Sequence, residues 1–456
     1  GSVRAQSHGN WQLCIADGGS RSPHVRRVLE EAGRSDARVR VAFLPENRGI
    51  AGNSNAALAL AEGEYVALLD HDDVLAPFAL SEAARAIAGH DPDMLYSDED
   101  KLTADGKRRF MPHFKPDWDA ELLRSCNYVA HLLVARRALV EAVGGFREGF
   151  DGSQDHDLIL RLSEKANKIV HIPKVLYHWR SHAKSTALHA GAKDYAAEAR
   201  RRAVGEHCAR AGVPARVETD GRYGILRVRY EIRHRPFVSV VIIGGEDGDL
   251  TRLSAEAAAR AAGWDDYEIV VLSRRTGLPA GDGRARFVEC AGRGRKAVLY
   301  AGAEAAKGNV LVLMEAGVAP VSEGWIGALY ELGQREDAGA VGCLLRYPNG
   351  ALLHAGVVPG FIGESGYVGD RRPADDPGYM ARVLCARETA AVSAACVMVG
   401  KRTLLYALRE TEGDDPGDVA LFAAVRRSGR RVYYTPHYQC VWHGVMALPV
   451  QGPADA

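Results

Sequence analysis

Residues 63–72 read GEYVALLDHD, a continuous apolar stretch that ends in two acidic residues with one histidine between them. An unbroken apolar run of this length is typical of a strand in a parallel sheet that helices cover on both faces. Asp70 and Asp72 follow the run directly, and alternate residues of an extended segment point the same way. Since ligands bind beyond the carboxyl ends of the strands in such a sheet, this stretch predicts an α/β fold with two carboxylates at its binding edge.

Further apolar strands alternate with helical stretches around this run. Residues 13–16 and 39–44 have the composition of buried strands, and residues 53–61 and 80–88 are predicted helices. This alternation predicts strands joined by right-handed crossovers in an α/β sheet.

The chain is long enough for two or three domains, and its pattern changes near residue 225. Residues 225–232 read as a strand, residues 233–236 form a short basic linker, and residues 238–243 open a new apolar strand. We therefore predict one domain over 1–232 and a second over 237–456.

The second domain repeats the order of the first. Residues 308–317 read GNVLVLMEAG and echo the opening stretch. In the first domain, Asp155 precedes a helix, a strand and His178; in the second, Asp418 precedes a helix, a strand and His443. Two such coincidences in the same order indicate a tandem duplication whose second copy has diverged.

Asp70 and Asp72 are candidate ligands of a divalent cation. Manganese (Mn²⁺) or magnesium (Mg²⁺) is held by oxygen ligands, typically one or two carboxylates together with substrate phosphates. An acidic turn that caps the next helix is the plainer interpretation of an isolated pair, because short motifs often match by chance. The buried strand before the pair and Pro77 after it favour the binding site.

Asp155 and His178 are candidates for the chemistry itself. Asp155 lies where an apolar-rich helix begins, so it either stabilises the helix N-terminus or acts as a general base toward a substrate hydroxyl. His178 follows the predicted strand 170–177 and would complete a metal shell, hydrogen-bond a phosphate, or be structural. His182 competes with His178 for the same role.

Asp17 and Arg48 are candidates for nucleotide binding. Asp17 ends the first visible strand, in DGGS, where its carboxylate would accept hydrogen bonds from a base or a ribose. A plain strand-to-helix turn is the alternative, since these residue types all favour turns. Arg48 would pair with a diphosphate or lie on the surface.

Composition and missing motifs exclude several classes of function. Lysine plus arginine equals aspartate plus glutamate at 58 each, so no charge excess indicates nucleic-acid binding. The 8 cysteines are scattered without a CxxC pair, which disfavours a zinc ribbon and fits a reducing compartment. The chain has no GxGxxG after a strand, no GxxxxGK[ST] and no GxSxG, which disfavours dinucleotide oxidoreductases, P-loop enzymes and serine hydrolases.

No apolar run approaches the roughly 18 residues that a membrane span needs, and no signal peptide is visible. We expect a cytoplasmic protein, and leave open a peripheral association with the inner face of the cell membrane.

Several motifs together resemble one enzyme family. In chain order they are DGGS at 17–20, NRG at 47–49 with Asn55, DHDD at 70–73, QDHDL at 154–158 and YHWR at 177–180. This set resembles the family 2 glycosyltransferases of the GT-A fold, over about residues 3–190. YSDEDK at 96–101 and FKPDW at 114–118 are similar to the subgroup that builds bacterial surface polysaccharides, often rhamnosyltransferases. Weaker similarity extends into the second domain through YPNG at 347–350, HAGVV at 354–358 and YYTP at 433–436.

The resemblance implies an inverting transfer, in a single displacement, from a UDP- or dTDP-linked sugar to a bacterial surface glycan or lipid-linked glycan. It implies that Asp70 and Asp72 hold Mn²⁺ or Mg²⁺ on the diphosphate and that His178 supports the metal or the diphosphate. Asp155 would be the base, and Asp17 would contact the nucleotide base. A cation at the departing diphosphate would lower the barrier, and the base would take the acceptor's proton from the opposite side of the sugar.

Two departures from the family qualify this interpretation. Residues 2–6 resemble the end of the family's first helix, so the first strand and its loop are absent from this sequence. In the second domain, residues 315–317 read EAG in place of DHD, residues 273–276 read SRRT in place of the Asp17 turn, and Ala420 replaces an acid. We therefore expect two tandem GT-A-type, Rossmann-like domains, the first lacking its N-terminal strand and the second degenerate and non-catalytic. The second domain would bind acceptor glycan, support the first domain or mediate assembly.

Two other functions remain open at this stage. A nucleotidyltransferase also uses paired aspartates on an α/β sheet, but a glycine-rich loop with Lys or Arg for the triphosphate is missing here. A catalytically impaired glycosyltransferase-like scaffold or glycan-binding protein is the second alternative.

Overall fold

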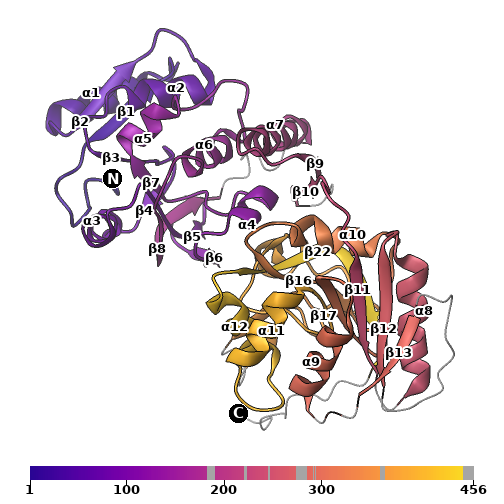
Figure 1. The fold of residues 1–456 in the computed structure, drawn as a ribbon. Helices are drawn as coiled ribbons and strands as arrows, with labels where there is room; N and C mark the ends of the chain where they lie inside the picture. Colours follow the sequence, from indigo (N-terminus) through magenta and orange to yellow (C-terminus); the bar gives the residue numbers. More distant parts are fainter. Residues whose placement is uncertain are drawn as a thin grey trace. The chain divides into compact units, whose positions relative to one another are not determined.

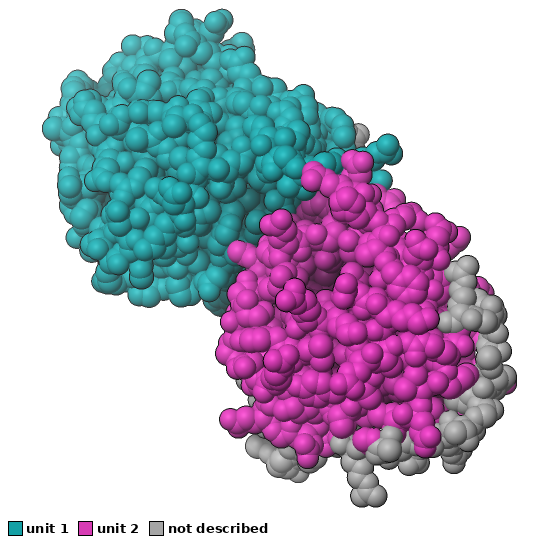
Figure 2. Space-filling view, viewed as in Figure 1, with its two compact units in different colours: residues 1–228 teal, residues 229–456 magenta. Residues whose placement is uncertain are grey.

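A computed structural model of the chain describes residues 1–181, 190–219, 223–244, 247–273, 285–290, 292, 294–359 and 365–444. His182 and residues 274–276, which the sequence analysis singled out, lie outside this part of the chain. The chain separates into two compact units, Gly1–Val228 and Arg229–Ala456 (Figure 2). Both units combine helices with sheets, so the predicted α/β fold is confirmed.

Unit 1 contains the following elements (Figure 1): β1 (Leu13–Asp17), α1 (Pro23–Ser35), β2 (Val39–Phe43), α2 (Gly49–Leu58), β3 (Tyr65–Ala67), β4 (Val74–Leu75), α3 (Ala79–His90), β5 (Met94–Leu102), β6 (Arg109–His113), α4 (Ala120–Ser125), β7 (Leu133–Arg136), α5 (Arg137–Ala142), α6 (Gln154–Ser163), β8 (Ile169–Arg180), α7 (Ala190–Arg210), β9 (Ala215–Thr219) and β10 (Leu226–Tyr230).

The main sheet of unit 1 has the strand order β3-β7-β5-β8-β4, with β6 beside β5, while β1 and β2 pair separately. β5 and β8 are parallel, as are β1 and β2, but β3–β7, β5–β7 and β4–β8 are antiparallel. The predicted parallel sheet is therefore mixed. An apolar run reports burial on both faces of a sheet and not the direction of the neighbouring strands, which explains the difference.

Unit 2 contains the following elements: β11 (Val238–Ile243), α8 (Gly248–Ala261), β12 (Tyr267–Ser273), β13 (Ala285–Glu289), α9 (Arg295–Ala305), β14 (Val310–Glu315), β15 (Val318–Pro320), α10 (Trp325–Gly333), β16 (Ala338–Arg346), β17 (Leu352–His354), β18 (Val357–Pro359), β19 (Ser365–Tyr367), a 3-10 helix η2 (Tyr379–Leu384), β20 (Arg387–Glu388), β21 (Cys396–Gly400), α11 (Lys401–Glu410), α12 (Asp418–Arg427) and β22 (Arg431–Trp442).

The large sheet of unit 2 has the strand order β13-β12-β11-β14-β21-β16-β22-β15. Helix α8 contacts β11 and β12, and α10 contacts β16 and β22, while α9, α11 and α12 pack together around the buried side chains of Leu299, Leu404 and Phe422. Helices thus flank a sheet in which β12 is buried throughout and β11 is buried up to its last residue.

The two units share one strand order with a single exception. The sheet strands of unit 1 have counterparts in unit 2 at the same place in the chain and in the strand order. Taken in the order β2, β1, β3, β7, β5, β8 and β4, they correspond to β13, β12, β14, β21, β16, β22 and β15. The exception is β11, which pairs in parallel with both β12 and β14. In the described part of unit 1, no strand joins β1 to β3. This match supports the tandem-duplication interpretation.

Three cysteines that are far apart in the sequence meet in the core of unit 2. The sulfur of Cys440 lies 3.8 Å from that of Cys343 and 3.7 Å from that of Cys396, and all eight cysteines of the chain are free thiols. The spacing of these cysteines in the sequence does not predict the cluster, because they lie on three different strands, β22, β16 and β21.

The structure also bears on the membrane question. Among the described residues, no helix combines the length and the apolar character that crossing a bilayer requires.

Candidate active site

The acidic residues after β3 form a tight turn that β8 holds in place. The backbone N–H of Asp73 donates to the carbonyl oxygen of Asp70 at 3.3 Å, which closes the turn. The Tyr177 hydroxyl donates to Asp73 Oδ2 at 2.5 Å and accepts from the backbone N–H of Asp70 at 3.2 Å. The backbone N–H of Arg180 donates to Asp73 Oδ1 at 2.7 Å, and its Nε donates to the carbonyl oxygen of Asp72 at 2.7 Å. Asp73 is therefore a buried anchor, whereas Asp70 keeps contact with solvent.

This turn changes the geometric argument made from the sequence. Because residues 70–73 turn instead of extending, Asp70 and Asp72 are not placed on one side by strand alternation. One oxygen of Asp72 lies 3.9 Å from His71 Nδ1. Among the described residues at this turn, Asp70, Asp73 and His131 each offer a potential ligand atom, and these atoms all lie within 4.8 Å of one another.

His131 was not found by sequence reasoning. It lies just before β7, and β7 runs antiparallel to β3, so the residues before β7 face those that follow β3. The His131 ring stacks on Tyr177 with 4.6 Å between ring centroids. Its backbone N–H donates to Glu99 Oε2 at 3.1 Å. The imidazole therefore has a fixed place beside the acidic turn.

The loop that carries His131 is held by a buried ion pair between two of the quoted motifs. Lys115 of FKPDW donates to the carbonyl oxygen of Val129 at 2.6 Å and also to that of His131. Its Nζ lies 3.4 Å from Glu99 Oε2, in YSDEDK. Burial acts to raise the pKa of Glu99, but the Lys115 ammonium together with His113 and His131 outweighs it, and the pKa falls to about 2. Glu99 is thus ionised at neutral pH and fixes the loop.

Asp155 lies in the first turn of α6, and the charge of its carboxylate acts on Asp70 in the acidic turn. Asn127 Nδ2 donates to Asp155 Oδ2 at 2.9 Å, and the backbone N–H of His156 donates to Oδ1 at 2.8 Å. The next acid, Asp157, is instead fully buried in ion pairs with Arg147 and Arg161. Only the first acid of QDHDL therefore belongs to the site, and Asn127 is a second residue that the sequence did not reveal.

The charges of this site act on Asp70. Desolvation by the surrounding protein raises the pKa of Asp70; His131 lowers it, whereas the carboxylates of Asp155 and Asp72 raise it. The structure therefore brings Asp70 and Asp155, from distant parts of the sequence, close enough for their charges to interact. A cation in this place would relieve repulsion between the carboxylates.

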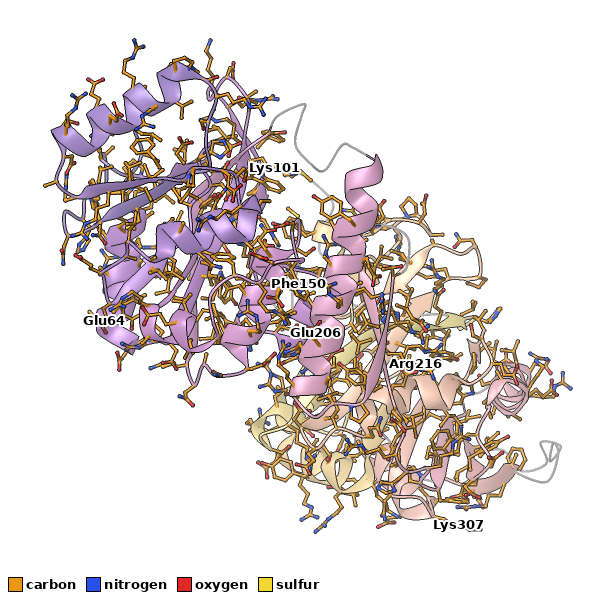
Figure 3. All side chains as sticks on the ribbon, turned by 90° about the horizontal axis from the view of Figure 1, so that it is seen from above. Glu64, Lys101, Phe150, Glu206, Arg216 and Lys307 are labelled. Carbon is orange, nitrogen blue, oxygen red and sulfur yellow. The ribbon has the colours of Figure 1, made fainter. Side chains whose placement is uncertain are left out.

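The loop before α6 is braced against α7, which lies alongside α6 (Figure 1). The Arg147 guanidinium lies 4.2 Å from the centre of the Phe150 ring and donates to Glu206 of α7 at 2.7 Å. Phe150 and Glu206 lie close together in Figure 3. Arg202 of α7 lies 4.2 Å from the same ring. These contacts fix where α6 begins, and with it Asp155.

His178 is held by a different carboxylate. Its Nδ1 lies 2.6 Å from Asp100 Oδ1, and Asp100 Oδ2 lies 3.3 Å from Arg109 Nε. A carboxylate oxygen accepts, so Nδ1 is the donor to Asp100, while Nε2 faces the Arg109 guanidinium at 3.5 Å, a group that can only donate. Metal-binding histidines are commonly oriented in this way. His178 is outside the grouping of Asp70, Asp73 and His131, so its metal role stays a prediction.

The turn at Asp17 and the backbone of Arg48 both lie next to Asn53. Asp17 Oδ1 accepts from the Ser20 hydroxyl at 2.5 Å and from the Ser20 backbone N–H at 3.2 Å, which is the turn expected as the alternative. Asn53 Oδ1 accepts from the backbone N–H of Arg48 at 3.2 Å. A Cβ on Gly18 would lie 2.6 Å from Asn53 Nδ2, so the Asp17 turn packs directly against α2. Arg48 itself is exposed.

The start of α2 also approaches the loop before α6. A Cβ on Gly49 would lie 3.6 Å from Asp151 Oδ2. Arg48, which precedes Gly49, therefore lies near the loop that leads to Asp155.

Comparison with known proteins identifies the family. Residues 1–142 match the family model described as "Glycosyl transferase family 2". Residues 1–142 thus carry a family 2 glycosyltransferase domain, as the motifs predicted.

Two curated relatives align along 97% of the chain. The chain is 37% identical over 461 residues to the uncharacterized protein y4gI of Sinorhizobium fredii (strain NBRC 101917 / NGR234), covering 97% of this chain and 50% of that protein. It is 34% identical over 455 residues to the O-antigen biosynthesis protein RfbC of Myxococcus xanthus, covering 97% of this chain and 36% of that protein. The chain thus spans half or less of the length of these relatives. Among solved structures, S. aureus TarS 1-349 in complex with UDP-GlcNAc matches with a TM-score of 0.37 and 22% identity, over 45% of this chain and 60% of that one.

Tyr177 supplies a first test of this site. We expect Tyr177→Phe to weaken Mn²⁺ binding about 10- to 100-fold, because its hydroxyl positions both Asp70 and Asp73 without touching the ion. Titration calorimetry with MnCl₂ measures the change. Tyr223→Phe, at an exposed tyrosine, is the matched control and should bind Mn²⁺ normally. Equal affinities for Tyr177→Phe and Tyr223→Phe would show that the acidic turn keeps its geometry without the Tyr177 hydroxyl.

Proposed function

We propose that unit 1 transfers a sugar from a UDP- or dTDP-linked donor to a hydroxyl group of a bacterial surface glycan or lipid-linked glycan. The observation that carries the proposal is geometric: potential ligand atoms of Asp70 and His131 lie within 4.8 Å of each other beside the acidic turn, and the charge of Asp155 also acts on Asp70. Asp70 comes from the end of a strand and Asp155 from the start of a helix, so metal and base have separate, rigid supports. A lipid-linked acceptor would require the enzyme to work at the inner face of the membrane.

The residues present fit Mn²⁺ or Mg²⁺. Asp70 and Asp72 would hold the ion through hard oxygen ligands, and His131 or His178 would add a nitrogen ligand, which Mn²⁺ accepts more readily than Mg²⁺. The bound cation supplies positive charge that stabilises the departing diphosphate.

Asp155 would act as the general base. Its Oδ2 accepts a hydrogen bond from the neutral amide of Asn127, which fixes the orientation of the carboxylate that would accept the proton. As the acceptor oxygen forms its bond to the anomeric carbon, its proton passes to Asp155. The bond between that carbon and the phosphate oxygen breaks on the opposite side, which releases a nucleoside diphosphate and inverts the centre.

Two buried oxygens near Asp155 support an acceptor site. Oδ1 of Asp151 and Oε1 of Gln154 have no hydrogen-bond partner among the described residues. Buried acceptors are normally paired, and sugar hydroxyls are donors that would satisfy them. We assign Asp151 and Gln154 to recognition of the acceptor.

On the donor side, we assign Arg48 to the diphosphate and Asp17 to the nucleotide. The exposed guanidinium of Arg48 suits bidentate pairing with phosphate oxygens. Ser20 engages only Oδ1 of Asp17, so the second oxygen would receive the donor groups of a base or ribose.

A panel of nucleotide sugars tests the proposal. With Mn²⁺ present, one UDP- or dTDP-sugar should raise the melting temperature and release a nucleoside diphosphate in the presence of acceptor glycan. Release of pyrophosphate would indicate a nucleotidyltransferase instead. Absence of any metal-dependent nucleotide binding would favour the scaffold.

Glu315→Ala should leave the transfer rate within about twofold of the unchanged enzyme. The end of β14 carries a single acid, and one carboxylate holds a metal-diphosphate poorly. The rate of product formation at saturating donor measures the effect. A large drop would mean that unit 2 takes part in the chemistry.

A further inference from the structure

Unit 2 preserves the acidic pair of unit 1 in a modified form. Glu315 ends β14, which occupies the place of β3 in the strand order, and Asp418 begins α12, which follows the chain order of α6. Desolvation raises the pKa of Glu315 and the Asp418 carboxylate raises it too, as Asp155 does for Asp70. In both units, an acid at a strand end thus meets an acid at a helix start.

Unit 2 differs from unit 1 in that a guanidinium, that of Arg295, lies beside its acidic pair. Arg295, the first residue of α9, donates through NH2 to Asp418 Oδ1 at 2.6 Å and through NH1 to the carbonyl oxygen of Pro416 at 2.9 Å. Its backbone N–H donates to Asp415 Oδ1 at 2.6 Å, so both ends of the residue are fixed beside α12. The same positive charge lowers the pKa of Glu315. One immobile cation therefore acts on both acids.

The second oxygen of Asp418 is also engaged. Tyr367 Oη lies 3.2 Å from Asp418 Oδ2 and 3.4 Å from Ser393 Oγ. In unit 1, by contrast, Asp155 is oriented by the neutral side chain of Asn127. The carboxylate of Asp418 is thus paired with a full charge, and that of Asp155 is not.

We infer that Arg295 is the resident cation of unit 2, and that its guanidinium takes the role that we propose for a divalent metal in unit 1. A guanidinium keeps its charge at any pH that the protein survives, and it would repel a second cation. Unit 2 therefore binds neither a divalent metal nor a metal-diphosphate at Glu315 and Asp418. The comparison with unit 1 rests on the proposed function, whereas the ion pair in unit 2 stands without it.

The test removes the Arg295 guanidinium from a chain in which Asp70→Asn has already eliminated the proposed metal site of unit 1. In Asp70→Asn, Mn²⁺ should not change the melting temperature. Adding Arg295→Ala should lower the metal-free melting temperature by about 10 °C, because a partly buried carboxylate loses its counter-ion. Millimolar Mn²⁺ should then restore much of that loss, and a further Asp418→Asn should abolish this response to the metal.

Arg252→Ala is the matched control, because Arg252 forms an exposed ion pair with Asp249 in the same unit. It should change neither the melting temperature nor the response to Mn²⁺. A response to Mn²⁺ in Asp70→Asn that Glu315→Gln removes would overturn the inference, as would an Arg295→Ala chain of unchanged stability. Neither result depends on sugar transfer, so failure of the proposed function would be seen separately, as absence of donor-dependent product.

Discussion

Asp155→Asn is expected to reduce sugar transfer by about 10²–10⁴-fold, the usual contribution of a general base, while donor binding changes little. Asparagine keeps the size of the side chain and can still accept hydrogen bonds from the His156 backbone N–H. It cannot take a proton at neutral pH. The nucleotide and the metal lie on the other side of the reacting carbon in our proposal, so their affinity should be preserved.

Two measurements separate this role from a structural one. Product formation from a radiolabelled nucleotide sugar gives the rate, and calorimetry with the nucleoside diphosphate and Mn²⁺ gives the affinity. Asp91→Asn is the control, because the Asp91 side chain is 85% exposed and its ion pair with Arg136 lies at the surface. A comparable loss of rate and affinity in Asp155→Asn would make Asp155 a support of the site.

The parts of the site that the sequence predicted depend on local signals. An apolar run that ends in acids identifies both a strand and its binding edge, so Asp70 could be placed without a structure. Asp155 was equally visible, because an acid before an apolar-rich helix marks a helix start. The structure puts both residues where these patterns indicated, and the family was predicted from the order of such short motifs.

The rest of the site depends on which strands pair and in which direction. His131 reaches Asp70 because β7 runs antiparallel to β3, and Tyr177 reaches the turn because β8 pairs with β4. An apolar pattern does not encode either pairing. The tight turn at 70–73 also removed the strand alternation on which the pairing of Asp70 with Asp72 was predicted.

Asp70→Asn should lower the rate of transfer by about 10³-fold, since a catalytic cation is worth several kcal/mol of transition-state stabilisation. Unlike Asp155→Asn, this change should also abolish Mn²⁺-dependent binding of the nucleoside diphosphate. The two variants thus divide the proposed site into a part that holds the leaving group and a part that activates the acceptor.

The same substitution should not destabilise the metal-free protein. The pKa of Asp70 is raised in the folded state, so folding favours the protonated form. This disfavours the folded state once the carboxyl ionises, and the penalty grows as the pH rises from the unfolded pKa to the folded one. At neutral pH the penalty is complete, and asparagine removes it. The metal-free Asp70→Asn chain should therefore unfold at the same or a higher urea concentration at pH 7, and the difference should vanish well below pH 4.

This combination distinguishes a binding residue from a structural one. A residue that supports the fold loses stability together with function, whereas a residue that is crowded in order to bind a cation loses function and keeps or gains stability. Loss of stability in metal-free Asp70→Asn would contradict the role of Asp70 as a metal ligand. Gain of stability with loss of Mn²⁺ binding would mean that desolvation and the neighbouring carboxylates make the ionised Asp70 unfavourable in the folded chain, and that a bound ion offsets this penalty.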